Sequence, residues 1–310
     1  MSHSASSQVA HHGRTLGALA VLTTAVLWGT TGTAATFAPE VGPLAIGAAA
    51  LGIGGLLQAL IAVPHLRKRR HELRRRPALV WSGACAVFVY PLAFYSSMHL
   101  AGVAIGTAVS LATAPLASGA LEWVLERRPL SRRWAIAAAL GIGGGALLTL
   151  AKVGDDAASA ADTALGIACG LIAGIAYAAY SWCVHRLLQH GMGRAASMGA
   201  VFGIGGLLLI PVLLVTGAPL LANGTNLAVG AYMAIVPMFI GYLLFGYGLT
   251  RVSPSTATTL TLSEPAVAAL LAVLVVGERL GGLGWLGMCG IGGALIVITA
   301  APRTARPRSP

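Results

Sequence analysis

A glutamate, a proline and several hydroxyl side chains lie together inside one long apolar run of the sequence. The stretch TTLTLSEPAVAALL covers residues 258–271 of a run that begins near residue 254 and ends near residue 276. A charged carboxylate at the centre of a membrane helix costs about 2.5–3.5 kcal/mol on insertion scales, so we expect Glu264 to face a polar cavity or the interior of a helix bundle. Thr261 lies three residues earlier, on the same helical face.

Pro265 directly follows the glutamate and predicts a bend in this helix. Proline has no amide N–H, and its ring crowds the carbonyl four residues earlier, which here belongs to Thr261. Three roles for Glu264 follow from this arrangement. The carboxyl group is a packing element beside a kink, it binds the cationic group of a solute, or it takes up and releases a proton during transport.

A second apolar run carries a similar polar stripe without the acid. The segment SLATAP ends at Pro115, and Ala114 stands where the other run has Glu264. We expect Pro115 to bend its helix as Pro265 does.

Aromatic side chains inside the apolar runs complete the set of candidate solute-binding residues. Packing with a satisfied polar group and lining of a cavity are equal alternatives for them. The predicted solute-binding set is Trp28, Tyr90, Tyr95, Tyr177, Tyr180, Tyr242, Thr261 and Glu264.

The composition excludes most classes of soluble protein. Hydrophobic residues make up 56% and charged residues 9% of the 310 residues, and the mean hydropathy is +0.81. A soluble chain carries about 25% charged residues, so this chain cannot cover a water-facing surface. The net charge of +11 lies in loops between apolar runs and does not indicate nucleic-acid binding.

The four cysteines show no metal-binding spacing, and the sequence has no HExxH or GxSxG motif, so we expect no cofactor, metal or enzymatic activity.

The apolar runs have the length of membrane-spanning helices. About 20 apolar residues cross the hydrocarbon, and helices satisfy every backbone group internally. We therefore predict an all-α polytopic membrane protein with ten transmembrane helices, over about residues 15–36, 43–63, 78–98, 102–125, 134–151, 164–184, 196–216, 227–249, 254–276 and 283–301.

Lysine and arginine are distributed unevenly between the connecting loops. With a cytoplasmic N-terminus, 18 of the 20 lie inside, and only Lys152 and Arg279 lie outside. The positive-inside rule therefore predicts cytoplasmic N- and C-termini.

The two halves of the chain resemble each other at a separation of roughly 150 residues. The segment YPLAFY at 90–95 matches YLLFGY at 242–247, Pro115 matches Pro265, GIGGGALLTLA at 141–151 matches GIGGALIVITA at 290–300, and Trp28 lies near the position of Tyr177. Five spans in each half make the repeats inverted, as in many secondary transporters. The predicted organisation is a disordered cytoplasmic tail over 1–14, a first repeat over 15–152, an external linker over 153–163, a second repeat over 164–301 and a cytoplasmic tail over 302–310.

Glycines at four-residue spacing predict close helix contacts within the bundle. The series Gly166, Gly170 and Gly174 and the pair Gly141 and Gly145 both have this spacing. Small residues at this spacing let two helix backbones approach each other.

Several motifs point to one transporter family. These are LWGTTG in the first span, SLATAP in the fourth, AYAAYSW in the sixth, and TLTLSEP with VVGERL in the ninth. With them the sequence resembles the EamA family of the drug/metabolite transporter superfamily, over about residues 15–301. The resemblance implies a ten-helix carrier of the bacterial inner membrane, often an exporter of amino acids or related metabolites. Relatives often carry an arginine early in the second span, which IGAAALGIGG lacks, so no anion site on such an arginine is expected.

The expected function is transport of a small organic metabolite by alternating access. The alternatives are a multidrug efflux carrier, a channel and a structural membrane protein. The expected partners are the solute and the lipid bilayer, with proton coupling as one interpretation of Glu264. Neither the solute nor the oligomeric state follows from the sequence.

The uneven charge distribution makes a direct prediction about topology. Reporter proteins fused after Pro77 and at the C-terminus should both report a cytoplasmic location, because the basic loops stay inside. A reporter fused after Ala158 should report an external location. A cytoplasmic signal at Ala158, measured with paired phosphatase and fluorescent reporters, would contradict the inverted ten-span topology.

Overall fold

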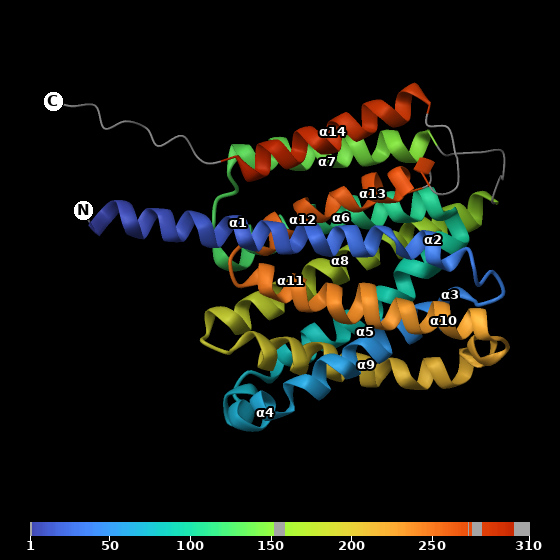
Figure 1. Ribbon diagram of the computed structural model, residues 1–310, viewed down its shortest axis with the longest axis horizontal. Coiled ribbons are helices and arrows are strands. Elements are labelled where there is room, and N and C mark those ends of the chain that lie inside the picture. The colour runs from blue at the N-terminus through green and yellow to red at the C-terminus, as the bar shows by residue number, and fades with distance from the viewer. Residues whose placement is uncertain (1, 152–158, 272, 275–280, 301–310) are drawn as a thin grey trace.

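A computed structural model describes residues 2–151, 159–271, 273–274 and 281–300, and within these ranges the chain forms helices and their connections, with no strand (Figure 1). The α-helices are α1 (Ser2–Gly29), α2 (Thr31–Ala35), α3 (Pro43–Gly47), α4 (Gly54–Arg74), α5 (Pro77–Ala101), α6 (Val103–Glu126), α7 (Arg132–Leu150), α8 (Ala160–Gln189), α9 (Arg194–Thr216), α10 (Gly224–Met233), α11 (Gly241–Leu249), α12 (Pro254–Leu260), α13 (Glu264–Leu271) and α14 (Gly282–Thr299). Two π-helical segments, Ala48–Ile53 and Ala234–Ile240, and two 3₁₀ segments, Ala218–Leu221 and Thr261–Ser263, connect some of them.

Nine helical segments within the described residues are long and apolar enough to cross a membrane. They correspond to nine of the ten predicted runs and are Gly13–Ala35, Pro43–Arg74, Pro77–Ala101, Ile105–Glu126, Arg132–Leu150, Ala160–Gln189, Arg194–Thr216, Gly224–Leu249 and Gly282–Thr299. The remaining predicted run, 254–276, contains α12, the 3₁₀ segment Thr261–Ser263 and α13, and it extends into residues outside the described ranges.

The helix around Glu264 is interrupted, as Pro265 predicts, because α12 changes to a 3₁₀ turn at Thr261–Ser263 before α13 begins. Hydroxyl groups accommodate the break. The Thr261 hydroxyl donates to the carbonyl oxygen of Thr258 at 3.0 Å, and the Ser263 hydroxyl donates to that of Leu260 at 2.8 Å. Such back-bonding competes with the regular helix pattern. In contrast, α6 continues through Pro115 without a change of helix type.

The first helix extends further than the sequence indicates. It begins at Ser2, within the segment over 1–14 for which a disordered tail was expected. Extension of an existing helix costs little once the first turn has formed, and residues 2–14 contain no proline to stop it. Similarly, α8 begins at Ala160 inside the predicted linker over 153–163, because the Ser159 hydroxyl accepts the N–H of Asp162 and caps it. The tail over 302–310, together with Lys152 and Arg279, lies outside the described residues.

One end of the helix bundle collects the chain segments with most of the basic residues. The start of α1 and the end of α14 lie at the same end, on the left of Figure 1, and the basic end of α4 lies there too. This arrangement places the segments that carry Arg14 and the cluster over 67–76 at one end of the bundle.

Glycines produce the tightest helix contacts. A Cβ atom on Gly166 would lie 2.5 Å from the Ala101 Cβ, and one on Gly174 would lie 2.4 Å from the Thr113 Cβ, so the predicted close helix contact is present, and the helices that approach α8 are α5 and α6. Between α7 and α14 the prediction is only half right. Gly141 contacts Leu262 and Ala294, but a Cβ on Gly145 would meet no atom within 4 Å.

The neighbouring Gly144 makes the close contact instead of Gly145. A Cβ on Gly144 would lie 2.6 Å from the carbonyl oxygen of Gly287 and 2.8 Å from the amide nitrogen of Ile291. The four-residue pattern alone did not identify which face of α7 meets α14, because three successive glycines, 143–145, offer three faces.

Two adjacent substitutions test this packing. Gly144→Ala should destabilise the protein by about 1–3 kcal/mol, because a backbone carbonyl cannot move aside for the new methyl group. Gly145→Ala should be neutral or stabilising by up to about 1 kcal/mol, since alanine favours the helix and meets open space. Thermal unfolding of the detergent-solubilised protein measures both. Equal losses in the two variants would contradict the assigned contact face.

Candidate functional site

A small cavity inside the bundle brings together five of the eight predicted solute-binding residues: Trp28, Tyr90, Tyr95, Tyr242 and Glu264. The other lining residues are Thr31, Gly47, Ala50, Leu51, Pro91, Phe94 and Met238. Its volume of about 20 Å³ holds roughly one water molecule. A metabolite therefore needs the surrounding helices to move apart before it can enter.

The Glu264 carboxylate is the acidic group of this cavity. The side chain is 8% exposed, at the first residue of α13. It makes no hydrogen bond or ion pair with any described residue, and no lysine or arginine lines the cavity. Gly29 lets α1 pass close by, since a Cβ there would lie 3.0 Å from the Glu264 carbonyl oxygen. A buried carboxyl group without a partner among the described residues is available to a cationic ligand or to a proton.

Two tyrosines of α5 also present unsatisfied polar groups to the cavity. The hydroxyl groups of Tyr90 and Tyr95 make no hydrogen bond to another described residue, although both side chains are buried. Gly47 permits this position of Tyr95, because a Cβ on Gly47 would lie 2.9 Å from the Tyr95 ring. The cavity therefore combines a carboxylate, two hydroxyl groups and aromatic faces.

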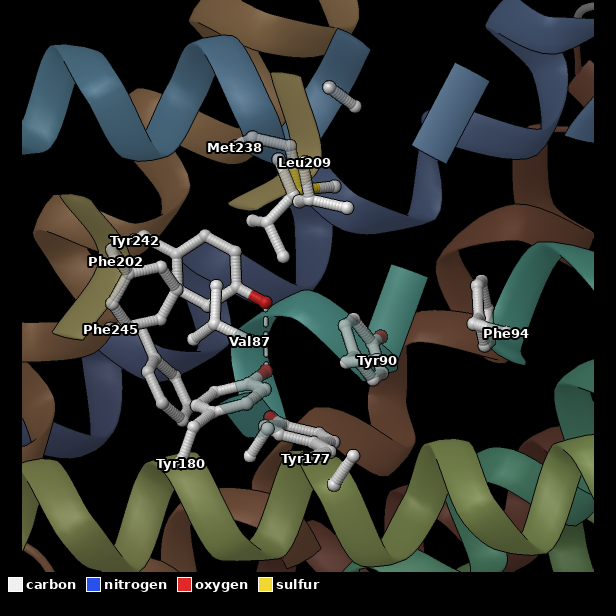
Figure 2. Close-up of a cluster of buried hydrophobic side chains, with 14 of the residues drawn as sticks. Val87, Tyr90, Phe94, Tyr177, Tyr180, Phe202, Leu209, Met238, Tyr242 and Phe245 are labelled. Carbon is white, nitrogen blue, oxygen red and sulfur yellow. Dashed lines mark hydrogen bonds between the residues drawn. The ribbon is translucent and has the colours of Figure 1, made fainter. Parts of the chain in front are cut away.

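The remaining three predicted residues lie behind the cavity wall and already have partners. The Tyr177 hydroxyl is 3.0 Å from the Thr261 hydroxyl, and the Tyr180 hydroxyl is 2.8 Å from that of Tyr242. Figure 2 shows these tyrosines among other buried rings, with Tyr177 and Tyr180 on the same helix and a dashed line joining Tyr180 to Tyr242. Their contacts favour the packing interpretation for Tyr177, Tyr180 and Thr261.

Trp28 connects α1 to the π-helical segment Ala234–Ile240, on another side of the cavity. Its indole Nε1–H donates to the carbonyl oxygen of Pro237 at 3.0 Å, and its ring lies 4.9 Å from that of Tyr242. Thr24, one turn earlier, donates to the carbonyl oxygen of Gly241 at 3.0 Å. The carbonyl group that accepts from Trp28 belongs to the π-helical segment Ala234–Ile240, and the one that accepts from Thr24 belongs to the first residue of α11.

Both π-helical segments contribute to the cavity wall. Ala50 and Leu51 come from Ala48–Ile53, and Met238 comes from Ala234–Ile240. Single π-helical turns are frequent at functional sites because they change the direction of nearby side chains.

The cavity also contains residues that the sequence did not indicate, among them Gly47, Pro91, Phe94 and Met238. Pro91 and Phe94 belong to YPLAFY, which the repeat had marked for its tyrosines only. Pro115 and Pro265 do not line the cavity, and Pro265 acts through the helix break beside Glu264.

Known proteins resemble the chain along nearly its whole length. The model of the EamA-like transporter family matches residues 15–150 and 164–300. The chain belongs to the EamA-like transporter family. It is therefore a multi-pass membrane transporter of small molecules and not an enzyme.

Individual relatives of this EamA-like transporter agree with that assignment. The uncharacterized transporter YwfM of Bacillus subtilis is 35% identical over 287 residues, which cover 92% of this chain and 94% of YwfM. The threonine/homoserine exporter RhtA of Salmonella typhimurium is 30% identical over 82% of this chain and 80% of its own. A solved crystal structure has a TM-score of 0.73 at 20% identity, covers 91% of this chain and 95% of its own, and supports the fold alone.

A double-mutant cycle tests the hydrogen bond between Tyr180 and Tyr242. Tyr180→Phe or Tyr242→Phe alone should destabilise the transporter by about 1–3 kcal/mol, because each leaves one buried hydroxyl without its partner. The double variant should cost less than the sum of the single variants, with a coupling of about 1 kcal/mol. Unfolding in detergent measures the cycle, with Tyr247→Phe as the control. Strictly additive losses would contradict a direct hydroxyl–hydroxyl bond.

Proposed function

We propose that this EamA-like transporter exports a small metabolite with a cationic group, such as an amino acid, across the bacterial inner membrane by alternating access. The observation that carries the proposal is the Glu264 carboxyl group, which is buried, has no partner among the described residues and faces the aromatic cavity. An ammonium group would gain a charge-assisted hydrogen bond from it. The hydroxyl groups of Tyr90 and Tyr95 would donate to the carboxylate of the same solute, and the aromatic faces would favour its cation.

Alternating access requires two bundles that move about a central site, and the inverted repeats would supply them. Two observations support this part of the proposal. The family model matches the chain twice, over 15–150 and 164–300. Residues from both matched segments line the cavity, and the Trp28 and Tyr177 rings, which the repeat aligns, lie 5.9 Å apart. Rocking of the two halves would enlarge the cavity toward one side at a time.

Further observations support the proposed direction of transport and the proposed membrane. The name of RhtA describes export of threonine and homoserine, which supports export of amino-acid-like compounds by this chain. Bacterial relatives and the uneven distribution of basic residues support an inner membrane with both termini in the cytoplasm.

Proton coupling would use the same carboxylate. Glu264 is the acidic residue among the described residues that line the cavity, and no arginine or lysine there holds it ionised. A proton and a cationic solute would then compete for one site, so that the arrival of one releases the other. In this scheme a proton entering from outside drives the solute outward.

The decisive variant is Glu264→Gln, which keeps the shape of the side chain and removes its charge. Transport of homoserine and threonine into proteoliposomes should fall by about tenfold or more, since a hydrogen bond to a charged group contributes about 1.5–3 kcal/mol. Solute-driven proton movement, followed with a pH-sensitive dye, should disappear. Glu72→Gln is the matched control, because Glu72 pairs with Arg69 on the half-exposed end of α4.

Three results would contradict the proposal. Normal transport by Glu264→Gln at both mildly acidic and mildly alkaline pH would leave the glutamate as a structural element beside the helix break. Absence of counterflow, meaning that preloaded solute does not accelerate uptake, would favour a channel over a carrier. Transport of many unrelated cations at similar rates would favour a multidrug efflux carrier.

A further inference from the structure

A second, much larger cavity lies away from the aromatic site, at the end of the bundle where α1 begins and α14 ends. Its volume is about 700 Å³. Basic, hydroxyl and apolar side chains line it: Arg14, Thr15, Ala18, Leu19, Leu22, Arg128, Arg133, His185, Thr250, Arg251, Val252, Ser253, Thr256, Leu260, Ile298, Thr299 and Ala300. We call it the basic cavity.

The charge of the basic cavity has one sign. Four arginines line it, and no aspartate or glutamate is present among its described lining residues. Arg128 is partly neutralised, since its Nε atom lies 3.4 Å from a carboxylate oxygen of Glu126.

Arg133 leaves part of its guanidinium group unsatisfied. Its Nε–H donates to the carbonyl oxygen of Val297 in the last turn of α14, where helix carbonyl groups lack internal partners. The Nη2 atom of the same group is buried and has no hydrogen-bond partner. A buried unpaired donor of this kind costs free energy unless a ligand accepts from it.

Residues at the C-terminal end of α11 hold the Arg251 side chain in place. Its guanidinium group lies 3.7 Å above the Tyr247 ring, and Nη1 donates to the Thr250 hydroxyl at 2.6 Å. Gly17 of α1 lies against the stem of this side chain, since a Cβ there would be 2.6 Å from the Arg251 Cβ. The arginine is thus ordered before any ligand arrives.

The cavity changes from basic to apolar along α1. Arg14 stands at the start of the membrane-spanning part, and Ala18 and Leu22 follow at one-turn spacing on the same face. Leu260 and Ile298 add further apolar surface, and Leu19 lines the cavity while 53% exposed at the outside of the bundle. A ligand with a charged head and an apolar tail matches this order.

We propose that the basic cavity binds one anionic phospholipid, with the phosphate at Arg133, Arg251 and Arg14 and an acyl chain along Ala18 and Leu22. Arginine suits phosphate because its planar guanidinium group donates two parallel hydrogen bonds. Basic cavities between helices at the level of the headgroups are typical sites for such lipids. The inference is independent of the solute and of Glu264.

Lipid titration of the purified transporter by native mass spectrometry tests the proposal. The wild-type protein should bind phosphatidylglycerol more tightly than phosphatidylcholine with the same acyl chains. Arg14→Gln with Arg133→Gln should weaken phosphatidylglycerol binding by about 25-fold, or about fivefold for each arginine, and leave phosphatidylcholine binding unchanged. The matched control is Arg67→Gln with Arg132→Gln, which removes two exposed arginines outside the cavity.

Further arms separate the lipid from a free anion and from loss of folding. Arg133→Lys keeps the charge, so it should retain most of the binding even if the bond to Val297 is lost. Glycerol 3-phosphate, which has the headgroup chemistry without a tail, should not displace the lipid at equal concentration. Equal weakening in the control pair, displacement by glycerol 3-phosphate, or equal affinity for both lipids would each overturn the proposal.

Discussion

Burial of one carboxylate at membrane depth is the constraint that the centre of this transporter has to accommodate. Glu264 stands where charge is costly, and no cation of the described chain compensates it. The helix changes to a 3₁₀ turn immediately before it, Gly29 lets α1 come close, and aromatic rings enclose the space in front of it. A buried acid without a partner among the described residues contributes little favourable free energy to packing. Its position therefore favours a role in ligand or proton binding.

The surroundings of the glutamate depend on helices that depart from regular geometry. Trp28 donates to a carbonyl group inside one π-helical segment, and the other π-helical segment supplies Ala50 and Leu51 to the cavity. In lipid, apolar helices gain no hydrophobic free energy from one another, so contacts rest on small residues and hydrogen bonds. The small residues are represented by the close contacts of Gly144 and Gly174. The hydrogen bonds are those of Thr24, Trp28 and the tyrosines.

The ionisable side chains that line the two cavities differ in kind. The central one contains an acid without a base, and the basic cavity contains arginines without a lining acid in the described chain. Side chains of α1 and of α12–α13 reach both, since Arg14 and Trp28 lie on one helix, and Thr256 of α12 and Glu264 of α13 belong to one interrupted span. The proposed lipid would therefore contact the same elements that line the central cavity, and would connect the bilayer to the proposed solute site.

The sequence by itself determined the membrane class, the approximate spans, the helix break beside Pro265 and the place of a carboxyl group inside an apolar run, because hydropathy, proline and buried charge act locally along the chain. It also identified the aromatic residues, since repeats and motifs are visible without coordinates. Only the tertiary structure decided which of them share the cavity. Tyr90 and Tyr95 line it, and their hydroxyl groups have no partner among the described residues, whereas Tyr177 and Tyr180 do not line it and hydrogen-bond to Thr261 and Tyr242. The same holds for Gly144 against Gly145, and for arginines distant in the chain that meet in the basic cavity. Periodicity places a residue on a helix, but the face that meets a neighbour depends on the rotation and packing of all the helices together.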